Sequence, residues 1–333
     1  MSVMSLVGAA SYMPPNVVGS SFFGQDPDAA GHDMFRGPRH RHHVTEDETT
    51  VGMIEKATRK LAGRLGISPK RDVDIILTNA PFHDTCFTGS GASLCRALDC
   101  EPMWVIDLAN TGCVSFVFMM ELARSLMASS AARTALVCNV QHTGGRIFAH
   151  PETRLKPQAA IPGDGCGVAY LVANGENPVR SIVTRTQPEF ADDMRVRCDG
   201  GQRWWEMRDT PLYMDFNPDR IASIVKRGIT LVPEVIRDAC RAAELPPEEL
   251  DLLITNQPNR TFLEKWRQSL GVAEERHVHS FEEHGNLFGA AMPVSLEAAA
   301  QQGLLRAGSH LAIGGFSHAG DYAGAAIVEW NAS

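Results

Sequence analysis

The residue with the clearest potential for chemistry is Cys113, in the segment DLANTGCVSF at residues 107–116. The pattern predicts a strand at Trp104–Asp107 and, over Ser115–Ala128, a helix that is apolar on almost every face. Cys113 is therefore expected at or near a helix N-terminus, where the helix dipole and unpaired backbone N–H groups favour the nucleophilic thiolate and lower the thiol pKa. The same placement is also typical of a buried structural cysteine, so other motifs have to decide.

Those motifs run along the chain in a fixed order. They are Gly37–His42 (GPRHRH) followed by Glu48 and Thr49, CFT at 86–88, PGDGCG at 162–167, NQPN at 256–259, HGN at 284–286, and a glycine-rich segment that runs to Trp330. Together with the Cys113 segment they resemble the ketoacyl synthase III family, the condensing enzymes of the thiolase superfamily that start fatty-acid synthesis, and its secondary-metabolism relatives. The resemblance extends over essentially the whole chain.

The expected fold class is α/β. Short strand patterns alternate with helical patterns, which is typical of α/β proteins. Strands are expected at 6–10, 74–79, 104–107, 135–139, 168–172, 181–184, 252–255, 310–313 and 325–329, and helices at 50–65, 90–98, 115–128, 219–243, 262–270 and 289–302. The resemblance implies the thiolase fold, five layers αβαβα made of two duplicated halves. We expect an N-terminal half, 1–175, with Cys113, and a C-terminal half, 176–333, with Asn256, Asn286 and the glycine-rich loop.

The resemblance also implies a two-step reaction and a homodimer. Cys113 would take an acyl group from a thioester of coenzyme A or an acyl carrier protein and pass it to a small-molecule or carrier-bound acceptor. The backbone N–H groups of Cys113 and Ala319 would form the oxyanion hole. Phe87 resembles the residue that the family inserts into the partner's acyl pocket, and its alternative is an ordinary core aromatic. Trp204 and Trp205 lie in the stretch 187–217, which fits neither half and is expected as a pocket wall or lid.

One departure from the family pattern bears directly on the chemistry. Where the family has a catalytic histidine in His-Gln-Ala-Asn, this chain has Asn256. Asn256 and Asn286 can donate hydrogen bonds to a thioester carbonyl, but neutral amides do not accept a proton near neutral pH, so decarboxylative condensation should be impaired. His318, in a loop where the family has glycines, is a candidate replacement base; its alternative is a ring turned away from the pocket. His142 is a second candidate base.

Three functions stay open. The leading interpretation is a ketosynthase III-like acyltransferase of secondary metabolism that acts through an acyl-Cys113 thioester. The first alternative is a decarboxylative Claisen-condensing 3-oxoacyl synthase, which release of carbon dioxide from a malonyl donor would reveal. The second is a non-catalytic partner subunit of a heteromeric condensing enzyme, which a homologue encoded beside this chain would favour.

Recognition of the donor also departs from the family. The basic pair that docks acyl carrier protein in the family falls on Gln268 and Ser269 here. Four basic residues could bind phosphates instead, with solvated surface charge as the alternative; they are Arg39, Arg41, Lys265 and Arg267. The segment between Asp107 and Cys113 is one residue longer than in the family pattern, which could displace the nucleophile.

Composition excludes several other classes of protein. The 333 residues carry a formal net charge of -8, which argues against nucleic-acid binding. No basic leader and no run of about 18 to 20 apolar residues is found, so neither a membrane span nor export is expected, and the location should be cytoplasmic. The eight cysteines are too sparse for a disulfide framework. Neither a metal nor a cofactor is expected, since arginines flank the histidine cluster at 40–43 and no GxGxxG or P-loop is present.

Overall fold

The computed structural model describes residues 3–24, 36–85, 88–198, 200, 203, 206 and 211–332. Its first sheet has the strand order β1-β7-β6-β4-β5. The strands are β1 (Met4–Tyr12), β4 (Ile75–Asn79), β5 (Trp104–Asp107), β6 (Thr134–Gln141) and β7 (Gly165–Ala173). β4 is buried along its whole length between two parallel neighbours, as is typical of a central strand covered on both faces.

The second sheet repeats the first. Its order is β12-β11-β13-β14-β8, and each pairing has the same sense as its counterpart in the first sheet. The strands are β8 (Val179–Thr186), β11 (Leu252–Thr255), β12 (His277–Val278), β13 (Ser309–Ser317) and β14 (Tyr322–Trp330). The expected duplication of an α/β half is therefore confirmed. The proposed division at 175/176 lies in the connection between β7 and β8.

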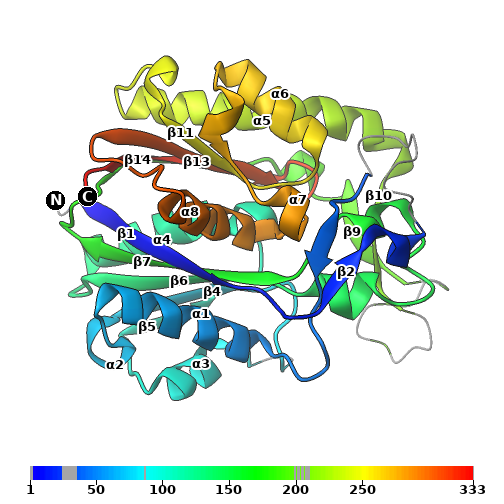
Figure 1. Cartoon of the computed structure of the whole chain (residues 1–333), viewed down its shortest axis with the longest axis horizontal. Coiled ribbons are helices and arrows are strands. Elements are labelled where there is room, and N and C mark those ends of the chain that lie inside the picture. The colour runs from blue at the N-terminus through cyan, green and yellow to red at the C-terminus, as the bar shows by residue number, and fades with distance from the viewer. Residues whose placement is uncertain are drawn as a thin grey trace.

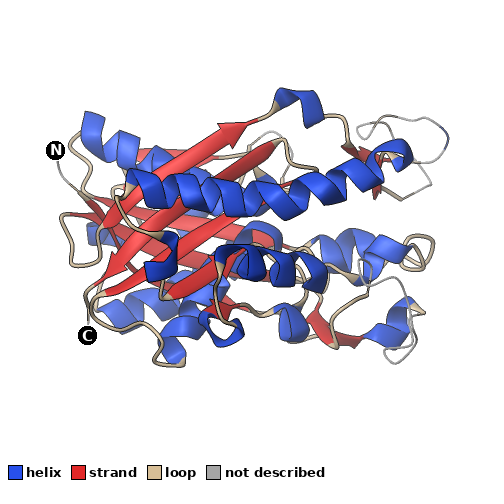
Figure 2. Ribbon diagram, turned by 90° about the horizontal axis from the view of Figure 1, so that it is seen from above, coloured by secondary structure: helices blue, strands red, loops and turns tan. Residues whose placement is uncertain are grey.

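Helices cover both faces of each sheet. α4 (Ser115–Ser129) and α8 (Ala291–Gln301) lie between the sheets, α1 (Thr50–Leu65) and α3 (Gly91–Leu98) cover the first sheet outside, and α5 (Ile221–Ala242) and α6 (Arg260–Leu270) cover the second (Figure 1). Seen from above, helices lie across the strands of the nearer sheet (Figure 2). The largest apolar cluster joins the two inner faces around α4 and α8. The expected five layers αβαβα are confirmed.

The central helix corrects one expectation from the sequence. Gly112–Ser129 is an 18-residue segment with mean hydropathy 1.3, so by length and composition it could cross a membrane, although no such run was expected. In the structure α4 contacts β4 and β6 on one side and β8 and β14 on the other. Its apolar surface is thus accounted for by the two sheets, as in the core helix of an α/β protein.

Short elements gather at one end of the molecule. The stretch 187–217, expected as a pocket wall, contains the hairpin of β9 (Met194–Arg197) and β10 (Tyr213–Phe216), close to the ribbon of β2 (Val17–Gly19) and β3 (His40–His42) (Figure 1). The remaining helical turns are α2 (Pro69–Asp72), α7 (Phe281–His284), η1 (Ser20–Phe23), η3 (Gly112–Val114), η4 (Gly144–Phe148), η5 (Pro157–Ala160), η6 (Pro188–Phe190), η8 (Pro218–Arg220), η9 (Pro247–Glu249), η10 (Glu274–Arg276) and η11 (Phe288–Ala290).

Candidate active site

Cys113 lies in η3, the short helical turn that leads directly into α4, and it lines a cavity of about 670 Å³. The expected placement at a helix N-terminus is confirmed. The turn before it contains two consecutive positive φ angles, 66° at Thr111 and 34° at Gly112. A β-branched residue is strained in this region, so the surrounding structure has to hold Thr111 there. This turn places Cys113 at the N-terminal end of α4.

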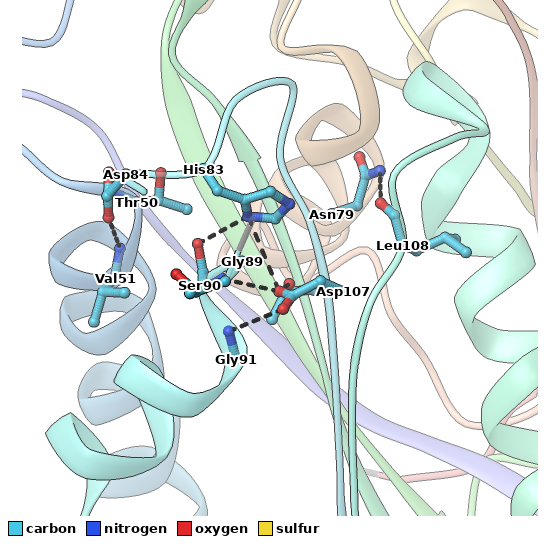
Figure 3. Close-up of polar contacts among 12 residues, drawn as sticks. Thr50, Val51, Asn79, His83, Asp84, Gly89, Ser90, Gly91, Asp107 and Leu108 are labelled. Atoms are coloured by element: carbon cyan, nitrogen blue, oxygen red, sulfur yellow. Dashed lines mark hydrogen bonds and ion pairs between the residues drawn. The ribbon is translucent and has the colours of Figure 1, made fainter. Parts of the chain in front are cut away.

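Polar contacts hold the connection that leads to Cys113. The Asn79 side chain donates to the carbonyl groups of Leu108 (2.7 Å) and Asn110 (3.1 Å). Asp107 accepts from the backbone N–H groups of Ser90 (3.3 Å) and Gly91 (3.1 Å), where α3 begins (Figure 3). Since Asp107 ends β5, this carboxylate joins the base of the 80–90 loop to the strand that leads to Cys113.

Burial changes the acidity of the thiol in the direction opposite to the one expected. It raises the pKa of Cys113 to about 12, and the Asp321 carboxylate adds to the rise. The backbone N–H groups of His318 and of Cys113 itself lower the pKa, but by less than burial raises it. The expectation that the helix N-terminus yields a low thiol pKa is therefore wrong, because the dipole and donors do not offset the loss of water around the sulfur.

This acidity predicts how the loading of Cys113 depends on pH. Below the thiol pKa, the thiolate fraction rises about tenfold per pH unit. The rate of acyl loading, followed by quenched-flow mass spectrometry between about pH 7 and about pH 9.5, should therefore rise with a logarithmic slope near one. A plateau that begins near neutral pH would contradict this prediction, since it would require that the thiolate already predominates in the resting protein.

The two expected amides, Asn286 and Asn256, both line the cavity but differ in how many of their hydrogen bonds are already made within the protein. The Asn286 carbonyl oxygen accepts from Phe288 N–H (3.0 Å), and its NH₂ group has no hydrogen-bond partner among the described residues. Asn256 makes two bonds with the backbone of Phe316: its NH₂ donates to the carbonyl (3.0 Å) and its oxygen accepts from the N–H (3.3 Å). Asn286 thus offers a free donor pair, whereas Asn256 keeps one N–H for a ligand.

His318 also lines the cavity, in the turn between β13 and β14. Its φ is 50°, and its Nδ1 lies 3.1 and 3.0 Å from the two carboxylate oxygens of Asp321. Its Nε2 lies 2.9 Å from the place where a Cβ on Gly112 would be, so the imidazole lies against the turn that carries Cys113. The structure brings His318 to the pocket and does not turn it away. Asp321 was missed by the sequence analysis.

The backbone donors of the expected oxyanion hole are placed as follows. Cys113 N–H donates to Ser317 Oγ (3.1 Å), and His318 N–H is the neighbouring donor at the sulfur. Ala319 is buried, is not among the described residues that line the cavity, and accepts from Arg227 Nε (2.8 Å) through its carbonyl. The roles of Cys113 and Ala319 in oxyanion binding stay predictions.

Arg227 on α5 holds the turn between β13 and β14 to the pocket wall, and no sequence signal pointed to it. Besides Ala319, its guanidinium binds Asp193 Oδ2 (2.8 Å) and lies 3.5 Å from the ring centroid of Phe190. Gly320, with φ of 106°, leaves room for the arginine, because a Cβ there would lie 2.7 Å from Arg227 Nε. The turn that carries His318 is thus fixed to the segment that leads into β9.

Most of the remaining cavity wall is apolar. This wall is formed by both strands of the β9–β10 hairpin, the first turns of α5 and the η4 segment. The lining residues there include Ile147, Phe148, Met194, Val196, Leu212, Met214, Phe216, Ile221, Ile224 and Val225. No Asp, Glu, Lys or Arg is found among the described residues that line it. Phe87, Trp204 and Trp205, expected in the pocket, lie outside the described residues.

Two of the other basic or titratable candidates do not reach the cavity. His142 is buried, contacts Phe82 O (2.7 Å) and Thr50 Oγ1 (3.1 Å), and has a pKa lowered to about 4 by burial. Arg41 is buried as well, so the expectation that it could bind a phosphate is wrong; it donates to backbone carbonyls and stacks on Phe23. These two residues support the structure around the site.

The remaining candidates for donor recognition lie near the surface. Gln268 and Ser269 are exposed, and Arg237 donates to Ser269 Oγ (2.9 Å). Arg267 pairs with Glu274 (2.8 Å). Arg39 and Lys265 are exposed, so phosphate binding by these two residues remains a prediction.

Asp164 of the PGDG turn holds the pocket wall through three backbone donors. Its Oδ1 accepts from Gly144 N–H (2.7 Å), and its Oδ2 accepts from Val44 (2.8 Å) and Gly145 (2.7 Å). Because Gly144 and Gly145 begin η4, the carboxylate fixes the turn that carries Ile147 into the cavity. Burial raises its pKa to about 7.

Replacement of this carboxylate should destabilise the fold. In Asp164→Asn the NH₂ group must face at least one backbone N–H, which should cost about 1–3 kcal/mol of unfolding free energy in urea at about pH 8. At about pH 5, below the raised pKa, the wild-type carboxyl is neutral and its burial costs less than that of the carboxylate, so the loss in Asp164→Asn should be larger than at about pH 8. The control Asp47→Asn, in an exposed turn, should stay within about 0.5 kcal/mol of wild type. An equal loss at both pH values would contradict this account.

Comparisons with known proteins agree with this geometry. A model of 3-oxoacyl-[acyl-carrier-protein (ACP)] synthase III matches residues 106–188, and the model of its C-terminal region matches residues 240–330, together more than half of the chain. A β-ketoacyl-[acyl-carrier-protein] synthase III of Rhizobium rhizogenes is 25% identical over 311 residues, 88% of either chain. The corresponding synthase of Coxiella burnetii is 22% identical over 99% of this chain and all of its own.

Solved structures share the fold. The 3-oxoacyl-[acyl-carrier-protein] synthase III of Aquifex aeolicus superposes with a TM-score of 0.83 at 18% identity, over 98% of this chain and 100% of its own. Cerulenin-bound OleA of Xanthomonas campestris gives 0.79 at 19% identity, over 99% and 98%. A tetronic acid condensing enzyme gives 0.80 at 20% identity, over 98% and 99%.

Proposed function

Because the chain belongs to the 3-oxoacyl-[acyl-carrier-protein] synthase III family of the thiolase superfamily, we propose that it is an acyltransferase of secondary metabolism. It loads an acyl group from a coenzyme A or carrier-protein thioester onto Cys113 and transfers it to a small-molecule or carrier-bound acceptor. The observation that carries this proposal is the position of Cys113, which lines an apolar cavity with backbone donors directed at its sulfur. We also propose that the protein acts in the cytoplasm.

The cavity supports an apolar acyl group. A charged acyl chain would enter without a counter-ion from the described lining residues, at a large desolvation cost. The NH₂ groups of Asn286 and Asn256 and the N–H of His318 are the donors placed near the reacting carbonyl. Stabilisation of a developing oxyanion by such donors is usually a large part of catalysis of acyl transfer.

Carbon–carbon condensation is the second candidate function. The free NH₂ of Asn286 favours it, because two amides could hold the enolate of a decarboxylated malonyl unit. The position of the family's catalytic histidine, however, is occupied by Asn256, whose carbonyl is bonded to Phe316 N–H. A non-catalytic partner subunit, the third candidate, is less well supported because the cavity with Cys113 is intact.

The test separates these functions by their products. Acyl-enzyme is formed with an octanoyl donor, and separate portions are mixed with malonyl-carrier thioester or with members of a panel of alcohols and amines. Carbon dioxide and acylated products are then measured in each portion. Our proposal expects oxygen or nitrogen acylation without carbon dioxide. Carbon dioxide in proportion to a 3-oxoacyl product would establish the condensing function, and an enzyme that never acquires an acyl group would favour the partner subunit.

We further propose that two copies pair along β5, the last strand of the first sheet. Three consecutive apolar residues, Met103, Trp104 and Val105, are exposed on or next to this strand, whose outer edge has no partner strand among the described residues. An apolar strand edge of this kind is a site for pairing with another chain. Pairing here would also bring the 80–90 loop, joined to β5 through Asp107, close to the second copy.

Charge on this edge should therefore dissociate the dimer. Sedimentation velocity should give a dimer for the wild type and a shift towards monomer for Val105→Lys, since a lysine would be desolvated in the contact. The control Leu155→Lys changes a more exposed apolar residue outside the sheet and should remain dimeric. A monomeric wild type, or a Val105→Lys variant with unchanged sedimentation, would contradict this arrangement.

A further inference from the structure

We propose that Asp321 is a positioning residue for transfer: it holds His318 with Nδ1 protonated and Nε2 free, so that Nε2 takes the proton of the acceptor. This proposal rests on the proposed function. It assigns the base that Asn256 does not supply to a different loop, the turn between β13 and β14, and adds a carboxylate that orients it.

The contact between the two side chains determines which nitrogen carries the proton. Nδ1 of His318 lies 3.1 and 3.0 Å from the two oxygens of Asp321, and a carboxylate only accepts, so the neutral imidazole has its hydrogen on Nδ1. Nε2 is then an acceptor. It lies on the side of Gly112, beside the cysteine turn, and the residue lines the cavity.

The carboxylate itself is fixed. Asp321 is buried, and its Oδ1 accepts from the N–H of Tyr322 (3.1 Å), so it cannot turn freely away from the imidazole. The guanidinium that reaches the same turn, that of Arg227, binds the carbonyl of Ala319 and the carboxylate of Asp193 instead. Among the described residues, His318 is therefore the basic side chain that the Asp321 carboxylate contacts.

The transfer step then balances as follows. Nε2 of His318 takes the proton of an acceptor hydroxyl or amine while the acceptor's oxygen or nitrogen attacks the thioester carbonyl carbon. The bond between that carbon and the Cys113 sulfur breaks, and the sulfur leaves with the electron pair. The proton on Nε2 passes to the sulfur, which restores the thiol and the neutral imidazole.

The raised pKa of the Cys113 thiol favours this return of the proton. A thiol whose pKa is about 12 is a poor leaving group as the free thiolate. An acid beside it lowers the cost of expulsion, and the imidazolium formed from the acceptor's proton is that acid. Because loading is the reverse of this expulsion, the same imidazole would take the proton of the thiol in that step.

Asp321→Asn is the first test. It should lower the single-turnover rate of acyl transfer from Cys113 to an alcohol or amine about a hundredfold or more, because an amide can donate to Nδ1 and so stabilise the wrong tautomer. Loading of Cys113, in which the imidazole would take the proton of a thiol and not of an alcohol or amine, should fall less than transfer. Asp99→Asn makes the same chemical change at an exposed helix end and should leave both rates unchanged.

A second measurement reads the tautomer directly and does not depend on activity. In ¹⁵N-labelled wild type, the His318 ring should show a protonated Nδ1 and an unprotonated Nε2, and Asp321→Asn should change this pattern. A protonated Nε2 in the neutral wild-type ring would overturn the proposal, even in a protein that never loads an acyl group. Failure of loading with the expected tautomer would instead contradict the proposed function.

A double-mutant cycle excludes a merely structural role for Asp321. His318→Gln removes the base while its amide can still bond to the carboxylate. In that background, Asp321→Asn should cause little further loss of transfer, because the residue would have no base left to position. The proposal would be overturned if the two substitutions reduced the transfer rate by independent factors that multiply, if the loading rate fell as much as the transfer rate, and if the melting temperature fell as well. These results would show that Asp321 only supports the fold.

Discussion

Cys113→Ala should abolish acyl loading and turnover while the fold remains. Alanine offers no nucleophile, and no other cysteine in the part of the chain that the structure describes lines the cavity. Loss of one buried sulfur should lower the free energy of unfolding by only about 1 kcal/mol. Loading is followed by intact-protein mass, turnover by release of free carrier thiol, and folding by urea denaturation.

The matched variant Cys113→Ser distinguishes the nucleophile from the space it occupies. It keeps the volume of the site and the backbone donors, but its hydroxyl is a far weaker nucleophile at neutral pH. Loading should fall by orders of magnitude, with the acyl oxygen ester detectable only after long incubation. Persistent loading in Cys113→Ala, or a normal rate in Cys113→Ser, would refute the assignment.

His318→Ala should slow transfer by about a hundredfold or more and slow loading far less. Among the described residues that line the cavity, the titratable side chains are the Cys113 thiol and the His318 imidazole. Removal of a general base typically lowers a rate by about a hundredfold or more. The rates are separated by loading the enzyme in one mixing step and adding the acceptor in a second. The split between the two rates is the signature of a base used in transfer.

The control for this variant lies in the same turn. Tyr322→Phe keeps the imidazole and its bond to Asp321, and removes only the hydroxyl that accepts from Asn110 (3.3 Å). It should retain transfer within about threefold of wild type. If His318→Ala turned over normally, His318 would return to a structural role. If His318→Ala lost loading and transfer equally, a general collapse of the loop would be the explanation.

Much of the fold could be predicted because local signals and tertiary packing agree. Helix α1 begins and ends as expected, since Thr49 caps its first turn and Gly66, with φ of 69°, ends it. α4 is apolar on almost every face because both sheets cover it, and that pattern is visible in the letters alone. The β9–β10 hairpin was not predicted as strands, because each strand is only four residues long and its alternation is too short to stand out.

The candidate site was only partly predictable. Motif spacing led to Cys113, Asn256, Asn286 and His318, and all four line one cavity. The acidity of Cys113 was predicted in the wrong direction, because the helix end is a local feature and burial is not. Asp321 lies three residues after His318, a spacing that carries no signal unless the turn between them is known, and Arg227 reaches the same loop from a distant helix.

The most direct test of acyl transfer through Cys113 is the intact mass of the wild-type protein after incubation with acyl-coenzyme A and acyl-carrier thioesters from acetyl to palmitoyl. Proteolysis and peptide mass then locate the adduct. We predict a gain of one acyl group per chain, on the peptide that contains Cys113, which disappears when an acceptor is added. An adduct on another cysteine, or none with any donor, would contradict the account.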